Sequence, residues 1–174
     1  LLDRGVLNEG YHPEMEALHL KNAAVLEEII DTHGFPTADK VGEEAYAAAW
    51  LVMQHAISKP DFMRKCARIL TNEVAKQAVD PVSLAYLTDR IASFEGRPQR
   101  YGTQFDWDDD GQMSPNPYDD FDLVEERRKA QGLKSLAAQI EHMRTLPDNQ
   151  NPPSYLRERN QAYNRWRKQV GWVK

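Results

Sequence analysis

Proline and glycine residues divide the first hundred residues of the chain into segments of helical length. Pro13 suits the first turn of a helix, where its missing N–H breaks no hydrogen bond, and Gly34 followed by Pro36 ends one. Apolar residues between these positions recur at helical spacing. The pattern predicts a helix from about Pro13 to His33.

Three more helices are predicted before Gly96. They run from about Val41 to Ile57, from Pro60 or Asp61 to about Val79, and from Asp80-Pro81 to about Phe94. The first of them contains nine consecutive apolar or aromatic residues, 45–53, which cover every direction of a helical wheel. We therefore expect this helix to be buried on most sides.

The helical pattern breaks over residues 99–118. A short strand is predicted over Gln99 to Phe105, and Asp110-Gly111 is typical of a hairpin turn. Helical patterns resume over 121–131, 135–146 and 155–170. The predicted fold class is mainly α: a helical bundle of about five to six helices, with a small β-hairpin or irregular insertion around 99–118.

With 174 residues the chain has the length of one domain. We expect a single helical domain over 1–146, a proline-rich linker over 147–153 and a basic amphipathic helix over 154–174. Residues 153–174 carry six basic side chains and one acid, whereas the whole chain has a net charge of −5. This segment suits RNA, a membrane surface or an acidic protein; docking on the acidic body of the same chain, or of a second copy in a homodimer, is preferred.

Composition and charge exclude several classes of protein. A single cysteine, Cys66, excludes an internal disulfide framework and a multi-thiolate metal site, and a buried thiol is expected. The acidic body argues against nucleic-acid binding, and no apolar run is long enough to predict a membrane span. The first five residues lack the pattern of a signal peptide, so we expect a cytoplasmic location, although a removed leader stays open because the chain lacks an initiating Met.

A set of short motifs resembles a bacterial family of small domains of unknown function. The resemblance covers roughly residues 14–133, implies no particular reaction and ends before the basic segment. The motifs are His33-Gly34-Phe35-Pro36-Thr37, Val41-Gly42, Ala49-Trp50-Leu51 with Gln54-His55-Ala56, Tyr86-Leu87-Thr88-Asp89-Arg90, and Pro98-Gln99-Arg100-Tyr101-Gly102-Thr103-Gln104.

Two polar residues, Gln54 and His55, interrupt the apolar helix. An amide and an imidazole need polar partners when they are buried, so they either lie satisfied in the core or line a cleft. His33, at the end of the first helix, is either a helix-terminal residue or the acid–base partner of His55. A metal site built on these histidines is disfavoured, because no metal-ligand spacing is present.

The second group of candidate residues follows the fourth helix. Asp89 and Arg90 form either a structural ion pair or, for Arg90, a grip on a carboxylate or phosphate. The segment 99–104 offers side chains that suit a polar small molecule or satisfy a buried loop, and Gly102 permits close approach of a ligand or another element. Its predicted substrate-binding residues are Gln99, Arg100, Tyr101 and Gln104.

An acidic run resembles the first half of a calcium-binding loop. Asp106, Asp108 and Asp110-Gly111 have the spacing of such a loop, but Pro117 stands where the closing glutamate belongs. An acidic hairpin tip is therefore preferred over a cation site.

The sequence favours a small-molecule-processing enzyme over a non-catalytic binding or protein-interaction module. In the enzyme hypothesis His55 and His33 supply acid–base chemistry for hydrolysis, elimination or group transfer. Arg90 and Arg100 bind the charge of a polar or anionic substrate, and Gln54, Gln99, Tyr101 and Gln104 orient it. No phosphate loop, dinucleotide fingerprint or Ser or Cys nucleophile motif is present, so no cofactor is expected. The hypothesis requires the histidines and arginines to converge on one pocket.

Overall fold

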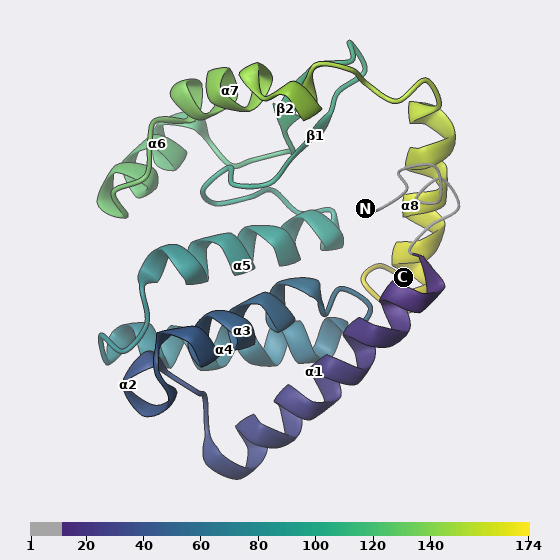
Figure 1. Ribbon diagram of the computed structural model, residues 1–174. Helices are drawn as coiled ribbons and strands as arrows, with labels where there is room; N and C mark the ends of the chain where they lie inside the picture. The colour runs from purple at the N-terminus through teal and green to yellow at the C-terminus, as the bar shows by residue number, and fades with distance from the viewer. Residues whose placement is uncertain (1–11) are drawn as a thin grey trace.

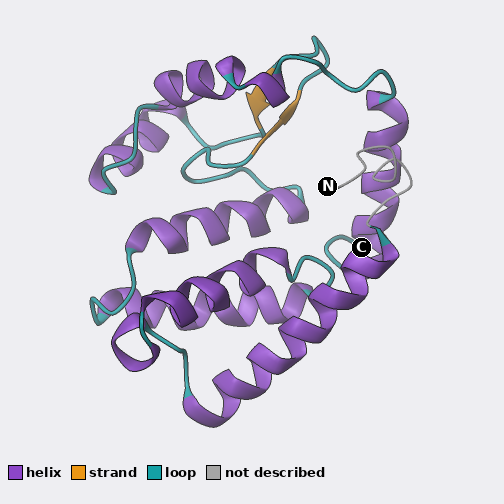
Figure 2. Ribbon diagram, in the orientation of Figure 1, coloured by secondary structure: helices purple, strands orange, loops and turns teal. Residues whose placement is uncertain are grey.

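The computed structural model describes residues 12–174; residues 1–11, and with them the prediction about a signal peptide, lie outside the described part. The described chain folds into eight α-helices and one two-stranded antiparallel sheet (Figures 1 and 2), which confirms the mainly α class with a small β insertion. The elements are α1 (Pro13–His33), α2 (Ala38–Val41), α3 (Glu43–His55), α4 (Pro60–Ala75), α5 (Pro81–Glu95), β1 (Phe105–Trp107), β2 (Met113–Pro115), α6 (Phe121–Ala130), α7 (Leu136–Thr145), a 3₁₀ turn (Pro147–Asn149) and α8 (Leu156–Val170).

Helix α5 lies between two layers of the molecule. On one side of it α1, α3 and α4 form a bundle, and on the other side lie the hairpin, α6 and α7 (Figure 1). Helix α8 stands at the edge of both layers. The main apolar core fills the bundle, and its largest fully buried side chains include Phe62, Met53, Met63, Leu70 and Leu87.

Side-chain caps explain where three of the helices begin. Asp80, which precedes Pro81, accepts the Val82 N–H with its carboxylate. Gly96 ends α5 with a backbone conformation in the left-handed region. Asp120 caps α6 and Ser135 caps α7 in the same way. Within residues 12–174 no helix combines the length and hydrophobicity that a membrane span requires.

Helix α3 is less buried than its composition predicts. Only Ala49 and Met53 are buried, and Leu51 is 59% exposed. The expectation of burial on most sides is therefore wrong. An apolar sequence indicates which side chains tolerate burial. How many of them are buried depends on how many other helices and loops pack against the helix.

Residues 99–104 do not form the predicted strand. The sheet is formed by Phe105–Trp107 and Met113–Pro115, with Asp106 opposite Ser114, and Gln99 makes an isolated bridge with Tyr118. The predicted turn is present: the Asp108 carboxylate accepts the N–H groups of Asp110 and Gln112 and the Ser114 hydroxyl.

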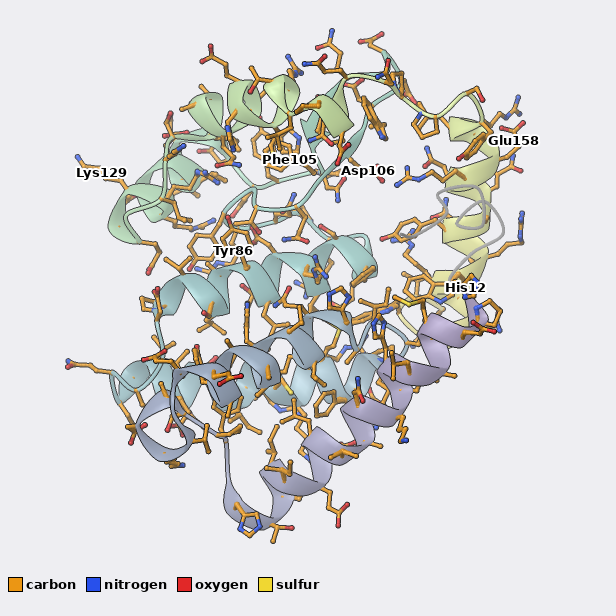
Figure 3. All side chains as sticks on the ribbon, in the orientation of Figure 1. His12, Tyr86, Phe105, Asp106, Lys129 and Glu158 are labelled. Atoms are coloured by element: carbon orange, nitrogen blue, oxygen red, sulfur yellow. The ribbon has the colours of Figure 1, made fainter. Side chains whose placement is uncertain are left out.

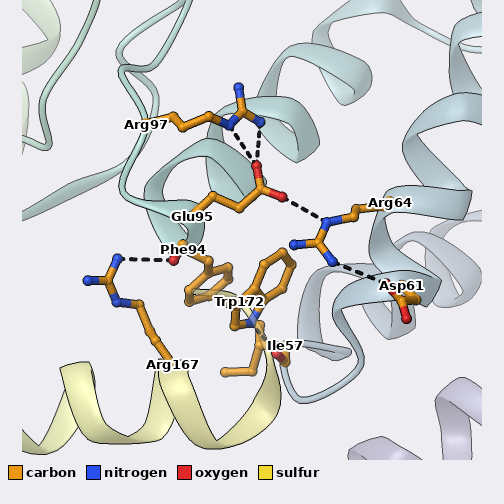
Figure 4. A network of polar contacts seen from close by, with 8 residues as sticks. All are labelled: Ile57, Asp61, Arg64, Phe94, Glu95, Arg97, Arg167 and Trp172. Carbon is orange, nitrogen blue, oxygen red and sulfur yellow. Dashed lines mark hydrogen bonds and ion pairs between the residues drawn. The ribbon is translucent and has the colours of Figure 1, made fainter. Parts of the chain in front are cut away.

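Helix α8 packs against its own chain through aromatic residues (Figure 4). The Trp172 indole is 3% exposed, donates its N–H to the Ile57 carbonyl at 2.7 Å and stacks on Phe94. Arg167 donates to the Phe94 carbonyl at 3.0 Å, and Arg64 lies over the Trp172 ring. The aromatic face is thus used within the chain, and docking of this helix on a second copy gains no support.

Replacing Trp172 tests this docking. Trp172→Ala should lower the free energy of unfolding by about 3–5 kcal/mol, because a large buried side chain is lost. Trp172→Phe, which retains most of the packing and loses the bond to Ile57, should cost about 1 kcal/mol. Denaturant unfolding measures both, and light scattering should give the same mass for each variant. An Ala variant as stable as the parent would show that Trp172 does not contribute to the core.

Candidate functional site

A buried carboxylate organises the loop that follows α5. Asp89 is 0% exposed and accepts the N–H of Arg100 at 2.8 Å, that of Tyr101 at 3.2 Å and that of Thr103 at 3.0 Å. The Thr103 hydroxyl also donates to it at 3.0 Å. Burial raises the pKa of Asp89, and these hydrogen bonds act in the opposite direction. Asp89 therefore binds the backbone of residues 100–103, an arrangement that we call the loop clamp, and does not form an ion pair with Arg90.

Three further groups complete the loop clamp. Arg128 of α6 is buried and donates to the Tyr101 carbonyl at 2.6 Å. Gln99 is fully buried; its amide donates to the Gln104 and Asn116 carbonyls, and its side-chain oxygen accepts the Gln104 N–H. A side chain at Gly102 would lie 2.9 Å from Leu136, and its φ is +61°. Glycine therefore permits a neighbouring helix to approach the loop.

Asp89→Asn should destabilise the fold strongly. An asparagine offers one acceptor oxygen and turns an NH2 group toward donors, so buried N–H groups lose their partner. We expect a loss of about 2–4 kcal/mol in the free energy of unfolding. Asp109→Asn, at an exposed hairpin position, is the matched control and should stay within about 0.5 kcal/mol of the parent. Equal losses in the two variants would contradict the clamp.

The loop clamp positions a chain of polar contacts that crosses α5. Arg90 donates through Nε to the Gln104 side-chain oxygen at 3.2 Å and through Nη1 to the Gln54 carbonyl at 2.8 Å. Gln104 in turn donates to the Thr103 hydroxyl at 3.1 Å. Arg90 thus links the Gln54-His55 end of α3 to the loop of residues 99–104.

A cavity of about 340 Å³ opens where α1, α5, the hairpin and α8 meet. Figure 3 labels His12 beside the start of α1, and Phe105 and Asp106 on β1, on the hairpin side of this region. Of the fourteen described residues that line it, nine are polar or ionisable and five are apolar or aromatic. Its residues are His12, Met15, His19, His55, Ile57, Arg90, Ser93, Phe94, Gln104, Phe105, Asp106, Asn116, Arg159 and Tyr163.

Two histidine rings lie side by side in this cavity. The ring centroids of His19 and His55 are 4.8 Å apart, at an interplanar angle of 37°. Burial lowers the pKa of His55, and His19 and the Arg90 charge lower it further. Burial also lowers the pKa of His19. Both imidazoles are thus neutral near neutral pH, the form that accepts a proton.

Several hydrogen-bonding atoms at the cavity are buried and unused. In the described part of the chain, His12 Nδ1, the Ser93 hydroxyl and Arg159 Nη1 are buried side-chain atoms without a hydrogen-bond partner. The side-chain amide nitrogen of Gln54, whose backbone carbonyl accepts from Arg90, is a fourth such atom. Unsatisfied buried polar groups are costly and rare, and their presence around one cavity indicates a place for a polar ligand.

The described residues offer no cluster for a metal ion. Within residues 12–174 no three His, Cys, Asp or Glu side chains are close enough to hold one. In the acidic hairpin, Asp106 forms an ion pair with Arg159 at 2.8 Å, and Asp108 caps the turn. Cys66 is buried, as predicted, and burial raises its pKa to about 12, so its thiolate is not available as a nucleophile.

Some of the predicted site residues line the cavity and others lie elsewhere. His55, Arg90 and Gln104 line it, and Gln54 contacts Arg90 from behind. The cavity lining does not include Gln99, Arg100, Tyr101 or His33. The loop clamp contains Gln99, and its Asp89 accepts the backbone N–H groups of Arg100 and Tyr101. His33 ends α1, about 21 Å along the helix from His19.

The residues that sequence reasoning missed come from the two ends of the described chain. His12 and His19 of the α1 region, and Arg159 and Tyr163 of α8, line the cavity. The spacing of seven residues between the two histidines places them on one helical face, a signal that was available in the sequence. Nothing in the sequence indicates that α8 covers the cavity.

The depressed pKa of His55 is measurable by NMR titration of its ring C–H signal. Its midpoint should lie below the ordinary value of about 6.5 and move upward in His19→Asn. Because the unfolded chain binds the proton more readily, the contribution of His55 to stability should be constant above pH 7, fall as the pH drops from about 6.5 towards the folded pKa, and level off below it. His55→Asn should flatten this fall. A midpoint above 6.5 would contradict the proposed surroundings of His55.

A model of a family of unknown function (DUF6624) matches residues 10–151. The match covers most of the chain, and the chain therefore belongs to this family. This agrees with the resemblance to small domains of unknown function seen in the sequence. No curated protein and no solved structure matches the chain. Helix α8, which supplies Arg159 and Tyr163, lies beyond the family match.

Proposed function

We propose that the protein is an enzyme that acts on a small anionic molecule, with His55 as general acid–base and Arg90 as the group that holds the negative charge. The observation that carries the proposal is the His55–His19 pair in the same cavity as Arg90. Among the described residues no carboxylate pairs with Arg90, whose guanidinium contacts only neutral acceptors. In this proposal His19 takes the partner role that the sequence suggested for His33.

The proposed chemistry follows from the protonation states at the cavity. A neutral His55 accepts a proton from water or from the substrate, and the adjacent Arg90 favours an anionic group close to it. The bound anion offsets the charge of Arg90, which raises the pKa of His55 and makes its imidazole a stronger base. The imidazolium that forms then returns the proton to a leaving group. Hydrolysis, elimination and group transfer all use such a step, and the proposal covers these three reaction types.

The second candidate is a non-catalytic binding module that uses the same cavity. Its supporting observation is the set of unused hydrogen-bonding atoms, because these indicate a ligand without requiring a reaction. A cytoplasmic location stays a prediction in either case.

The two candidates are separated by following a mixture of small cellular metabolites by mass spectrometry in the presence of the purified chain. An enzyme should consume at least one anionic compound, and His55→Asn should slow this by about a hundredfold or more. His33→Asn, at the far end of α1, is the matched control and should retain the parent rate. An equal rate in His55→Asn would overturn the assigned role. Retention of a compound without conversion would favour the binding module.

A further inference from the structure

Among the residues of 12–174 that line it, the cavity carries one uncompensated positive charge. The charged lining residues in this range are Arg90, Asp106 and Arg159, and the last two form an ion pair at 2.8 Å. The lowered pKa values of His19 and His55 keep these rings neutral near neutral pH. Burial lowers the pKa of Arg90, but a guanidinium stays charged in proteins. One negative charge on a ligand therefore balances the site.

The free edge of Arg90 fits a carboxylate. Its Nε and one Nη1 hydrogen are used by Gln104 and Gln54, respectively. Within residues 12–174 no acceptor takes the other three Nη hydrogens, and donors on Nη1 and Nη2 of a guanidinium can bind two oxygens of one planar group. Gln104 and Gln54 also fix the plane of the guanidinium, so little side-chain entropy is lost on binding.

Part of the cavity wall is apolar and suited to a flat apolar body. Phe94 of α5, Phe105 of β1 and Tyr163 of α8 bring aromatic rings to it from three separate elements. Ile57 and Met15 add aliphatic surface. Aromatic groups prefer offset or edge contacts with other rings. An inorganic anion would leave this surface uncovered, and the volume of about 340 Å³ is at the small end for ligand pockets.

We infer that the ligand is a small aromatic carboxylate, with its carboxylate on Arg90 and its ring against Phe105 and Tyr163. This inference rests on the proposed function, because it uses the same cavity and names the class of substrate. Tyr163 belongs to α8, beyond the family match at residues 10–151, so the class of ligand depends in part on a segment outside that match.

Benzoate is the probe that tests the inference by isothermal titration calorimetry. The full chain should bind it with a dissociation constant of about 1 mM or tighter. Benzamide, which lacks the charge, and acetate, which lacks the ring, should each bind at least about tenfold more weakly. Inorganic phosphate should bind more weakly than benzoate, because it leaves the aromatic surface uncovered.

Variants locate the binding to the cavity. Arg90→Gln and Tyr163→Leu should each weaken benzoate binding by about tenfold, and Arg68→Gln, on an exposed part of α4, should not change it. Thermal melting checks that each variant is folded. If Arg90→Gln does not fold, the comparison of benzoate with benzamide on the parent chain and the Tyr163 variant still decides the result.

The outcomes separate this inference from the proposed function. Failure of benzoate to bind, or tighter binding of phosphate, overturns the aromatic carboxylate and leaves the acid–base role of His55 untouched. Benzoate binding that depends on Arg90 and Tyr163 supports the inference even if His55→Asn proves to have no effect on turnover. Equal binding of benzoate and benzamide would overturn the assigned role of Arg90.

Discussion

The buried carboxylate of Asp89 is the interaction on which the rest of the site depends. It sits on α5 between two layers of the molecule and holds the backbone of residues 100–103. This loop positions Gln104, Gln104 fixes Arg90, and Arg90 reaches across to the end of α3. A change at Asp89 thus acts on the cavity through the loop, without any contact with a ligand.

Asp89 and Arg128 show how opposite charges stabilise a loop without forming a direct ion pair. The carboxylate accepts N–H groups on one side of the backbone, and the guanidinium donates to the Tyr101 and Gly102 carbonyls. Each buried charge is satisfied by peptide groups, which are polar but neutral. The loop can therefore be irregular and still leave few backbone groups without a partner.

The sequence was sufficient to predict the helices that have local start and stop signals. Asp80-Pro81 and Gly96 bound α5 through contacts that span a few residues, so the pattern predicts them well. The strand predicted over Gln99 to Phe105 does not form before Phe105, because the N–H groups of residues 100, 101 and 103 bond to the Asp89 carboxylate about a dozen residues earlier. Periodicity contains no information about such a partner.

The candidate site was partly predictable for the same reason. His55 and Arg90 are polar residues on helices that are largely apolar, so the sequence alone indicates them as candidate site residues. The choice between His19 and His33 depends on which end of α1 lies beside α5 and α8. That is a property of the tertiary arrangement, which helical spacing does not determine.

The docking of α8 also affects the entropic cost of forming the cavity. The bond from Trp172 to the Ile57 carbonyl joins positions 115 residues apart, whereas the loop clamp joins Asp89 to residues 11 to 14 positions later. Short loops close at a lower entropic cost and sooner than long ones. The side of the cavity that α8 supplies therefore depends on a contact of much longer range, with a higher entropic cost of closure, than the loop that positions Arg90.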